Sequence, residues 1–159
     1  TDDLDVDVVG TFSSQEEVGT RGAVIAANKV KPDLAIVFEG CPADDTFLED
    51  HEIQTAIKRG PMLRHIDARM ITNPRFQRYS LKIAKDNLIP VQESVRKSGG
   101  TNGAAIHLSN EGVPTIVIGI PVRYSHTHYG IASYEDYMNS VKLAVEILRS
   151  LDPSVINSF

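Results

Sequence analysis

Side chains of the kinds that bind metals follow three predicted strands of this sequence. Adjacent Glu16 and Glu17 come after the first predicted strand, Glu39 ends the second, and His126 lies in the loop after the last. In open α/β sheets, ligands bind beyond the carboxyl ends of the strands, so we expect these side chains to converge. Carboxylates with an imidazole suit zinc, cobalt or manganese better than calcium. In an adjacent glutamate pair, one carboxylate could bind a metal while the other stays free as a general base.

Each of these residues also has an ordinary structural interpretation. Glu16 and Glu17 could compensate the dipole at the start of a helix. Glu39 could emerge into solvent at the end of its strand, and His126 could be a solvated loop residue. The hydrolytic interpretation therefore depends on convergence of all four side chains and not on any one of them.

A glycine-rich loop, residues 98–103, precedes a predicted short helix. It contains Gly100, Thr101 and Asn102, and its N–H groups could hold a carboxylate or a carbonyl oxygen. The loop lacks the Gly-Lys-Ser/Thr ending of a Walker motif, so nucleotide phosphate binding is not indicated. A plain tight turn is the alternative interpretation.

The pattern of apolar segments predicts an α/β fold with a mixed, mostly parallel sheet and helices on both faces. Strands are predicted over residues 4–12, 33–39, 91–95 and 114–120, with one or two short strands within 62–71. Helices are predicted over residues 18–29, 73–87, 104–110 and 134–151. Residues 40–60 form a long loop of the kind that is often functional. Asp44 and Asp45 are expected to be a solvated pair in that loop.

Length and composition limit the possible classes of protein. The 159 residues suffice for one compact domain, and the 42% of apolar residues are typical of a globular chain. The net charge of −5 argues against nucleic-acid binding. No apolar run approaches the roughly 18 residues that span a bilayer, so we expect no membrane partner. A single cysteine, Cys41, and no visible secretory signal predict a cytoplasmic protein.

Taken together, five segments resemble the TET-type dinuclear metallo-aminopeptidases. This family comprises glutamyl and deblocking aminopeptidases, and some of its members carry an endoglucanase label. The resemblance covers residues 1 to about 151 in the right order. Its segments are Ser14-Gln15-Glu16-Glu17-Val18-Gly19-Thr20-Arg21-Gly22-Ala23, Pro32-Asp33 leading to Glu39, Gly99-Gly100-Thr101-Asn102 with Ala105-Ile106-His107, Gly112-Val113-Pro114-Thr115 and Arg123-Tyr124-Ser125-His126.

The resemblance implies a role for each candidate residue. Glu16 would be the general base, and two divalent metals, zinc or cobalt with manganese as the alternative, would be held by ligands that include Glu17, Glu39 and His126. The loop residues Gly100, Thr101 and Asn102, with Arg123 and Tyr124, would bind substrate; many members carry Asp in place of Asn102. The implied substrates are peptides, cleaved at the N-terminal peptide bond, and the implied full-length state is a homo-oligomer.

The same resemblance implies that part of the catalytic domain lies upstream of Thr1. Family members carry a His in a His-x-Asp segment and a bridging Asp before the Gln-Glu-Glu segment, and the oligomerisation domain also lies there. Residues 1–159 therefore resemble the C-terminal portion of a catalytic domain, and we predict that this portion is inactive alone. A related amidohydrolase or deacylase is one alternative function. A non-catalytic binding module is the other, if the chain is naturally this short.

Overall fold

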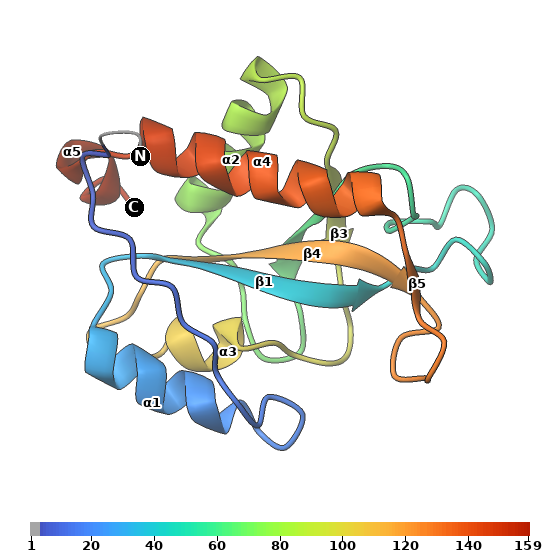
Figure 1. Ribbon diagram of the computed structural model, residues 1–159, viewed down its shortest axis with the longest axis horizontal. Helices are drawn as coiled ribbons and strands as arrows, with labels where there is room; N and C mark the ends of the chain where they lie inside the picture. Colours follow the sequence, from blue (N-terminus) through green and yellow to red (C-terminus); the bar gives the residue numbers. More distant parts are fainter. Residues whose placement is uncertain (1–3) are drawn as a thin grey trace.

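The computed structural model describes residues 4–159 and shows strands and helices interspersed along the chain (Figure 1). The sheet consists of β1 (Ala35–Pro42), β2 (Met62–Ile66), β3 (Gln92–Val95), β4 (Thr115–Arg123) and β5 (Ile131–Ala132). The helices are α1 (Arg21–Val30), α2 (Pro74–Asp86), α3 (Gly103–Ile106), α4 (Tyr134–Ser150) and α5 (Pro153–Ile156). The short elements β5 and α5 were not predicted from the sequence.

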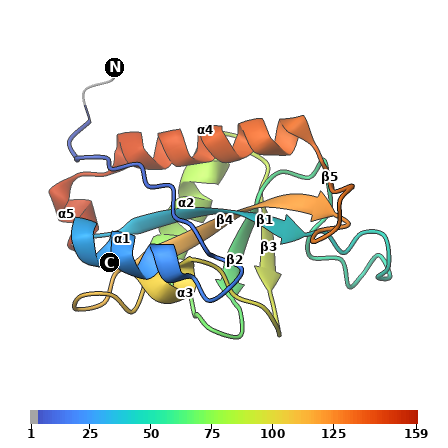
Figure 2. The same ribbon diagram turned by 60° about the horizontal axis from the view of Figure 1, so that its bottom comes forward.

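The sheet is mixed, as the sequence predicted. Its order is β1-β4-β2-β3, with β5 paired to β4. β1 runs parallel to β4 in continuous register from Ala35 opposite Thr115 to Pro42 opposite Val122. β2 is antiparallel to β4 and parallel to β3, which forms the far edge. β1 and β4 therefore end side by side, at one edge of the sheet (Figure 2).

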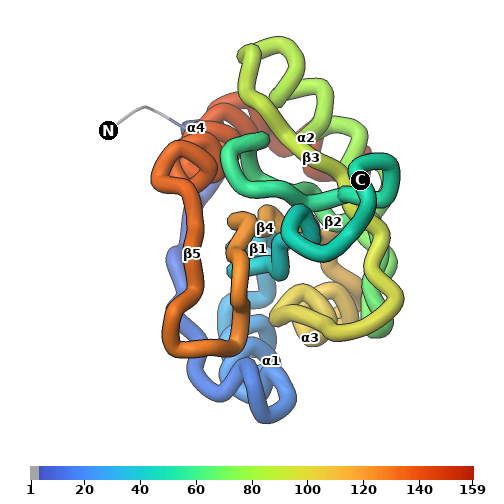
Figure 3. Tube along the Cα trace, turned by 90° about the vertical axis from the view of Figure 1, so that its right-hand side faces the viewer, coloured from blue at the N-terminus to red at the C-terminus, as the bar shows by residue number. Residues whose placement is uncertain are grey.

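Helices cover both faces of the sheet. α2 and α4 lie on one face, and α1 and α3 lie on the other (Figures 1 and 3). The larger core lies under α2 and α4, where Phe76, Ile116, Ile118, Leu143 and Ile147 have no exposed surface. The smaller core, formed by Val37, Met70 and Val117, is joined by Ile106 of α3. Each face of the sheet thus buries its own set of apolar side chains, which explains the near-continuous apolar sequence of β4.

Local signals explain where two of the helices begin. The Asn73 side chain accepts hydrogen bonds from the N–H groups of Arg75 and Phe76, and Pro74 occupies the first turn of α2, as predicted. α1 begins at Arg21 instead of the predicted Val18. Gly19 and Thr20 have φ angles of +114° and +54°, and these left-handed conformations cannot continue into a right-handed helix. The residues before Arg21 therefore form a turn.

The predicted strand over residues 4–12 is wrong. This segment pairs with no strand in the described part of the chain, and Val8 and Val9 are 54% and 61% exposed. A strand forms only when a neighbour satisfies its backbone hydrogen-bonding groups, and a β-branched composition cannot replace that neighbour. The sequence predicted that the candidate side chains follow three strands. In the structure they follow two strands, β1 and β4, and a turn carries Glu16 and Glu17.

None of the helices within residues 4–159 is both long and apolar enough to cross a membrane.

Candidate metal and substrate site

The four chemistry-bearing side chains line one cavity at the carboxyl ends of β1 and β4. The cavity has a volume of about 450 Å³, and Glu16, Glu17, Glu39 and His126 all contribute to its wall. Gly100 and Thr101 line it as well, with the neighbouring Ser98 and Gly99 of the same loop. The convergence expected from the sequence is therefore present in the structure.

Glu39 is held at the cavity by the glycine-rich loop. Its Oε1 accepts a hydrogen bond of 3.0 Å from the backbone N–H of Asn102. Burial raises the pKa of Glu39, while the Asn102 hydrogen bond opposes that effect; the negative charges of Glu16 and Glu17 raise the pKa further, and Arg64 lowers it. A carboxyl group in these surroundings favours a nearby cation, because positive charge stabilises the ionised form.

Glu17 and His126 approach each other at the open side of the cavity. The Oε1 atom of Glu17 lies 3.5 Å from Nδ1 of His126, and both side chains are largely exposed. Tyr124 and His126 have φ angles of +58° and +62° in the turn after β4, and Gln15 has +61° just before the glutamate pair. Left-handed backbone at non-glycine residues is strained, and here it shapes the turns that carry the glutamate pair and His126.

The described residues at the cavity offer donor atoms of the kinds that bind metals. Glu17 and His126 supply a carboxylate and an imidazole, the donor types that zinc takes. In residues 4–159, however, no three His, Cys, Asp or Glu side chains are arranged to hold one ion. A catalytic zinc normally has three protein ligands and a water, so the donors fit the implied metals in kind and fall short in number.

Three arginines that the sequence interpretation missed line the cavity. Arg64, Arg69 and Arg96 all line the cavity. Arg64 is 5% exposed and donates to Asp67 at 3.0 Å, and Arg96 donates to Asp44 at 3.1 Å. Arg96 is distant in the sequence from Arg64 and Arg69, and the tertiary fold brings all three to the cavity that the glutamates also line. Their spacing in the sequence carried no signal.

The expectation that Asp44 and Asp45 are a solvated pair is wrong. Asp44 is 2% exposed and accepts from the N–H of Thr55 in addition to Arg96. Asp45 binds Arg123 through two hydrogen bonds of 2.9 and 2.8 Å. The reason is that both carboxylates fasten the loop of residues 40–60 to neighbouring strands and turns.

The structure places Arg123 and Tyr124 outside the set of residues that line the cavity. Arg123 is engaged by Asp45, and the Tyr124 ring makes an edge contact with Tyr129, with centroids 5.9 Å apart. Their predicted contact with substrate thus stays a prediction. Gly100 and Thr101 do line the cavity, while Asn102 reaches it through its N–H bond to Glu39.

Comparison with known proteins defines the class. The chain matches the profile of the M42 glutamyl aminopeptidase family over residues 1–143. It is 38% identical over 144 residues to a putative aminopeptidase of Acetivibrio thermocellus, covering 91% of this chain and 43% of that protein. The chain belongs to the M42 aminopeptidase family.

Solved structures of related peptidases share the fold. The TET aminopeptidase of the archaeon Thaumarchaeota archaeon SCGC AB-539-E09 superimposes with a TM-score of 0.88 at 37% identity, covering 92% of this chain and 41% of that one. The TET1 peptidase of Pyrococcus horikoshii, which can assemble into a tetrahedron or a large octahedral shell, gives 0.72 at 28% identity, covering 88% and 40%. The chain thus spans about two fifths of the length of these relatives.

Proposed function

We propose that residues 1–159 are the C-terminal portion of the catalytic domain of a metal-dependent aminopeptidase, which hydrolyses the N-terminal peptide bond of peptides. The observation that carries this proposal is the gathering of Glu16, Glu17, Glu39 and His126 on one cavity. Family membership supports the same reaction. The whole protein would be a homo-oligomer, a proposal supported by the assembly of the Pyrococcus horikoshii relative.

Each of the four candidate site residues has a proposed role. Glu17, His126 and Glu39 would hold two divalent ions, zinc or cobalt in preference to manganese, together with ligands outside this chain. Such ions, when bound, lower the pKa of a bound water and polarise a carbonyl group. Glu16 lines the cavity beside Glu17 and would accept the proton of the attacking water and return it to the leaving amine.

The glycine-rich loop would keep Glu39 in place. The Asn102 N–H donates to the Glu39 carboxylate, and Thr101 is 2% exposed and accepts from the Gly103 N–H, so the loop is held at the cavity wall. A fixed ligand loses less conformational entropy on binding a metal, which favours affinity.

Substitutions at Glu16 and Glu17 distinguish the proposed general base from the proposed metal ligand. We expect Glu16→Gln to reduce hydrolysis of an aminoacyl anilide by at least about 100-fold, the usual contribution of a general base, with metal content unchanged. Glu17→Gln should lose metal first, because ligands set affinity. The measurements are metal content and kcat in a fusion of this chain to the part of the A. thermocellus relative that lies outside their match.

The two variants are isosteric controls for each other, since both remove one negative charge at adjacent positions. Loss of metal from Glu16→Gln with full metal in Glu17→Gln would reverse the assigned roles. An active fusion that retains no divalent metal after chelation would contradict the proposed chemistry altogether.

A further inference from the structure

A second cavity lies where the end of β2 meets the start of α2. Its volume is about 310 Å³, and it shares no lining residue with the candidate metal and substrate site. Ile66, Ile71 and Pro74 give it apolar walls, and Gln77 and Arg78 of α2 line it as well. The cavity is therefore separate from the candidate catalytic residues and mostly apolar.

Gln77 indicates what kind of group this cavity accepts. The residue is 2% exposed, and neither polar atom of its side-chain amide has a hydrogen-bond partner within residues 4–159. His65, at the same wall, is by contrast engaged by Glu93 at 2.6 Å. Buried polar groups are nearly always hydrogen-bonded, so the free amide points to an occupant that both donates and accepts. A peptide segment with an apolar side chain has these properties.

α2 carries a row of basic side chains beside the cavity. Arg78 lines the cavity, and Lys82 and Lys85 follow it at helical spacing on the same face. Lys82 pairs with Asp86, whereas Arg78 and Lys85 pair with no acidic group in the part of the chain that the structure describes. We call Arg78, Lys82 and Lys85 the basic row of α2.

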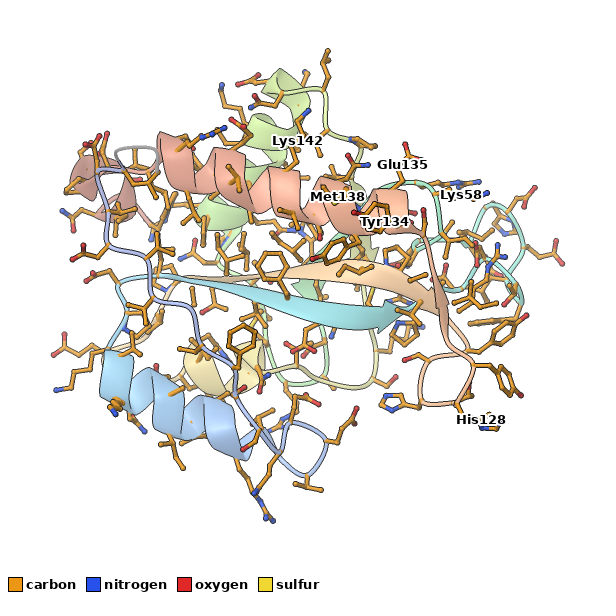
Figure 4. All side chains as sticks on the ribbon, viewed as in Figure 1. Lys58, His128, Tyr134, Glu135, Met138 and Lys142 are labelled. Carbon is orange, nitrogen blue, oxygen red and sulfur yellow. The ribbon has the colours of Figure 1, made fainter. Side chains whose placement is uncertain are left out.

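α4 extends the positive charge beyond the basic row of α2. Lys142 lies on the side of α4 next to α2 (Figure 4), and its Nζ donates to the backbone oxygen of Asn87, directly after α2. The whole chain has a net charge of −5, so this concentration of positive charge is local. Complementary charge favours an acidic segment as the occupant.

The loop that follows β1 has the matching features. Phe47 is 72% exposed, so it fills no cavity of its own chain, and Glu49 and Glu52 are exposed close behind it. The N–H groups of Phe47 and Leu48 donate to the backbone oxygen of Asp44, which holds this part of the loop in a turn. Figure 1 shows the loop projecting beyond the ends of the strands. A segment fixed in this way loses little conformational entropy when it binds.

We propose that residues 47–52 of one copy of this chain dock on a second copy. The Phe47 ring enters the cavity, the backbone beside it bonds to the Gln77 amide, and Glu49 and Glu52 lie against the basic row of α2. The two surfaces are different, so the contact is heterologous. A two-fold pair of copies forms it twice, and a ring forms it once between each pair of neighbours.

This contact specifies one interface of the proposed homo-oligomer and is independent of the proposed reaction. The test is sedimentation equilibrium of the purified 159-residue chain, which should self-associate in a concentration-dependent manner. We expect Phe47→Ala and Arg78→Glu each to raise the dissociation constant at least tenfold, as loss of a central contact does. Phe12→Ala and Lys29→Glu, at exposed positions of the N-terminal segment and α1, are the matched controls and should leave it unchanged.

A charge exchange distinguishes a specific contact from general damage to the surface. Glu49→Arg alone should weaken association as Arg78→Glu does, and an equimolar mixture of the two variants should restore it, because each loop then meets a cavity of opposite charge. The side-chain amide resonances of Gln77 should shift as the copies associate.

Several outcomes would overturn the proposal. These are a chain that stays monomeric at its highest soluble concentration, association that Phe47→Ala leaves unchanged, and a mixture that does not recover association. Association without any change at the Gln77 amide would assign the interface to another surface and overturns the proposal as well. A monomeric chain whose fusion is an active peptidase would count against this contact and leave the proposed reaction intact.

Discussion

At the scale of single residues, this protein uses its acidic side chains in two different ways. Glu16, Glu17 and Glu39 line a cavity, whereas Asp44 and Asp45 are bound to arginines and backbone N–H groups. The sequence did not reveal that Asp44 and Asp45 are bound by other groups. Their arginine partners lie 52 and 78 residues away, and their backbone N–H partners Thr55 and Ile57 lie 11 and 12 residues away.

The Asp45–Arg123 pair predicts a pH-dependent contribution to stability. Hydrogen bonding from Arg123 lowers the pKa of Asp45. A carboxyl group with a lowered native pKa stabilises the fold above its unfolded pKa of about 3.9, and this contribution is lost as the pH falls through the native pKa. Asp45→Asn should therefore lower the urea midpoint at pH 7 and have a smaller effect below pH 3.

Asp50→Asn, at an exposed position of the same loop, is the matched control and should leave both midpoints unchanged. Equal destabilisation by Asp45→Asn at both pH values would show that the ion pair contributes nothing.

At the scale of elements, the long loop of residues 40–60 is fastened at both ends. Asp136, fully buried in the first turn of α4, accepts hydrogen bonds from the N–H groups of Lys58 at 2.6 Å and Gly60 at 2.8 Å. The Gln92 side chain joins β3 to the backbone of Ala56 and Gly60. The part of this loop that follows β1, residues 43–61, therefore connects α4 to the sheet although it contains no helix or strand.

Gly60 is the position in this loop where a side chain cannot fit. Its φ is +87°, and a Cβ atom there would lie 2.0 Å from the carbonyl oxygen of Pro90. We expect Gly60→Ala to reduce the free energy of unfolding by about 1–3 kcal/mol or more, measured by urea denaturation. Gly10→Ala is the control, because nothing lies within 4 Å of its Cβ position. Equal stability of the two variants would contradict this account.

At the scale of the whole molecule, three observations support the proposal that this chain is part of a larger α/β domain. The chain spans about two fifths of the length of its relatives, and within residues 4–159 the outer edge of β1 is unpaired and the cavity carries fewer metal donors than one ion needs. These three observations concern different properties and agree with one another.

We expect the isolated chain to have no peptidase activity. We expect no measurable hydrolysis of leucine or glutamate p-nitroanilide by the purified 159-residue chain with zinc or cobalt, because two metals cannot be held by the donors present. Zinc titration should show weak binding that Glu17→Gln reduces further. The fusion described above is the positive control, and robust hydrolysis by the isolated chain would contradict the prediction.

The sequence by itself determined the fold class, most element positions and four of the residues that line the cavity. These features depend on short stretches of sequence, so they can be predicted from one sequence alone. Examples are the apolar strands, the start of α2 at Asn73 and Pro74, and the polar residues that follow strands. The tertiary structure alone decided which acidic residues pair with arginines, which arginines face the cavity and whether residues 4–12 form a strand. These depend on contacts between distant segments, and a strand in particular exists only where another backbone is available to accept and donate its hydrogen bonds.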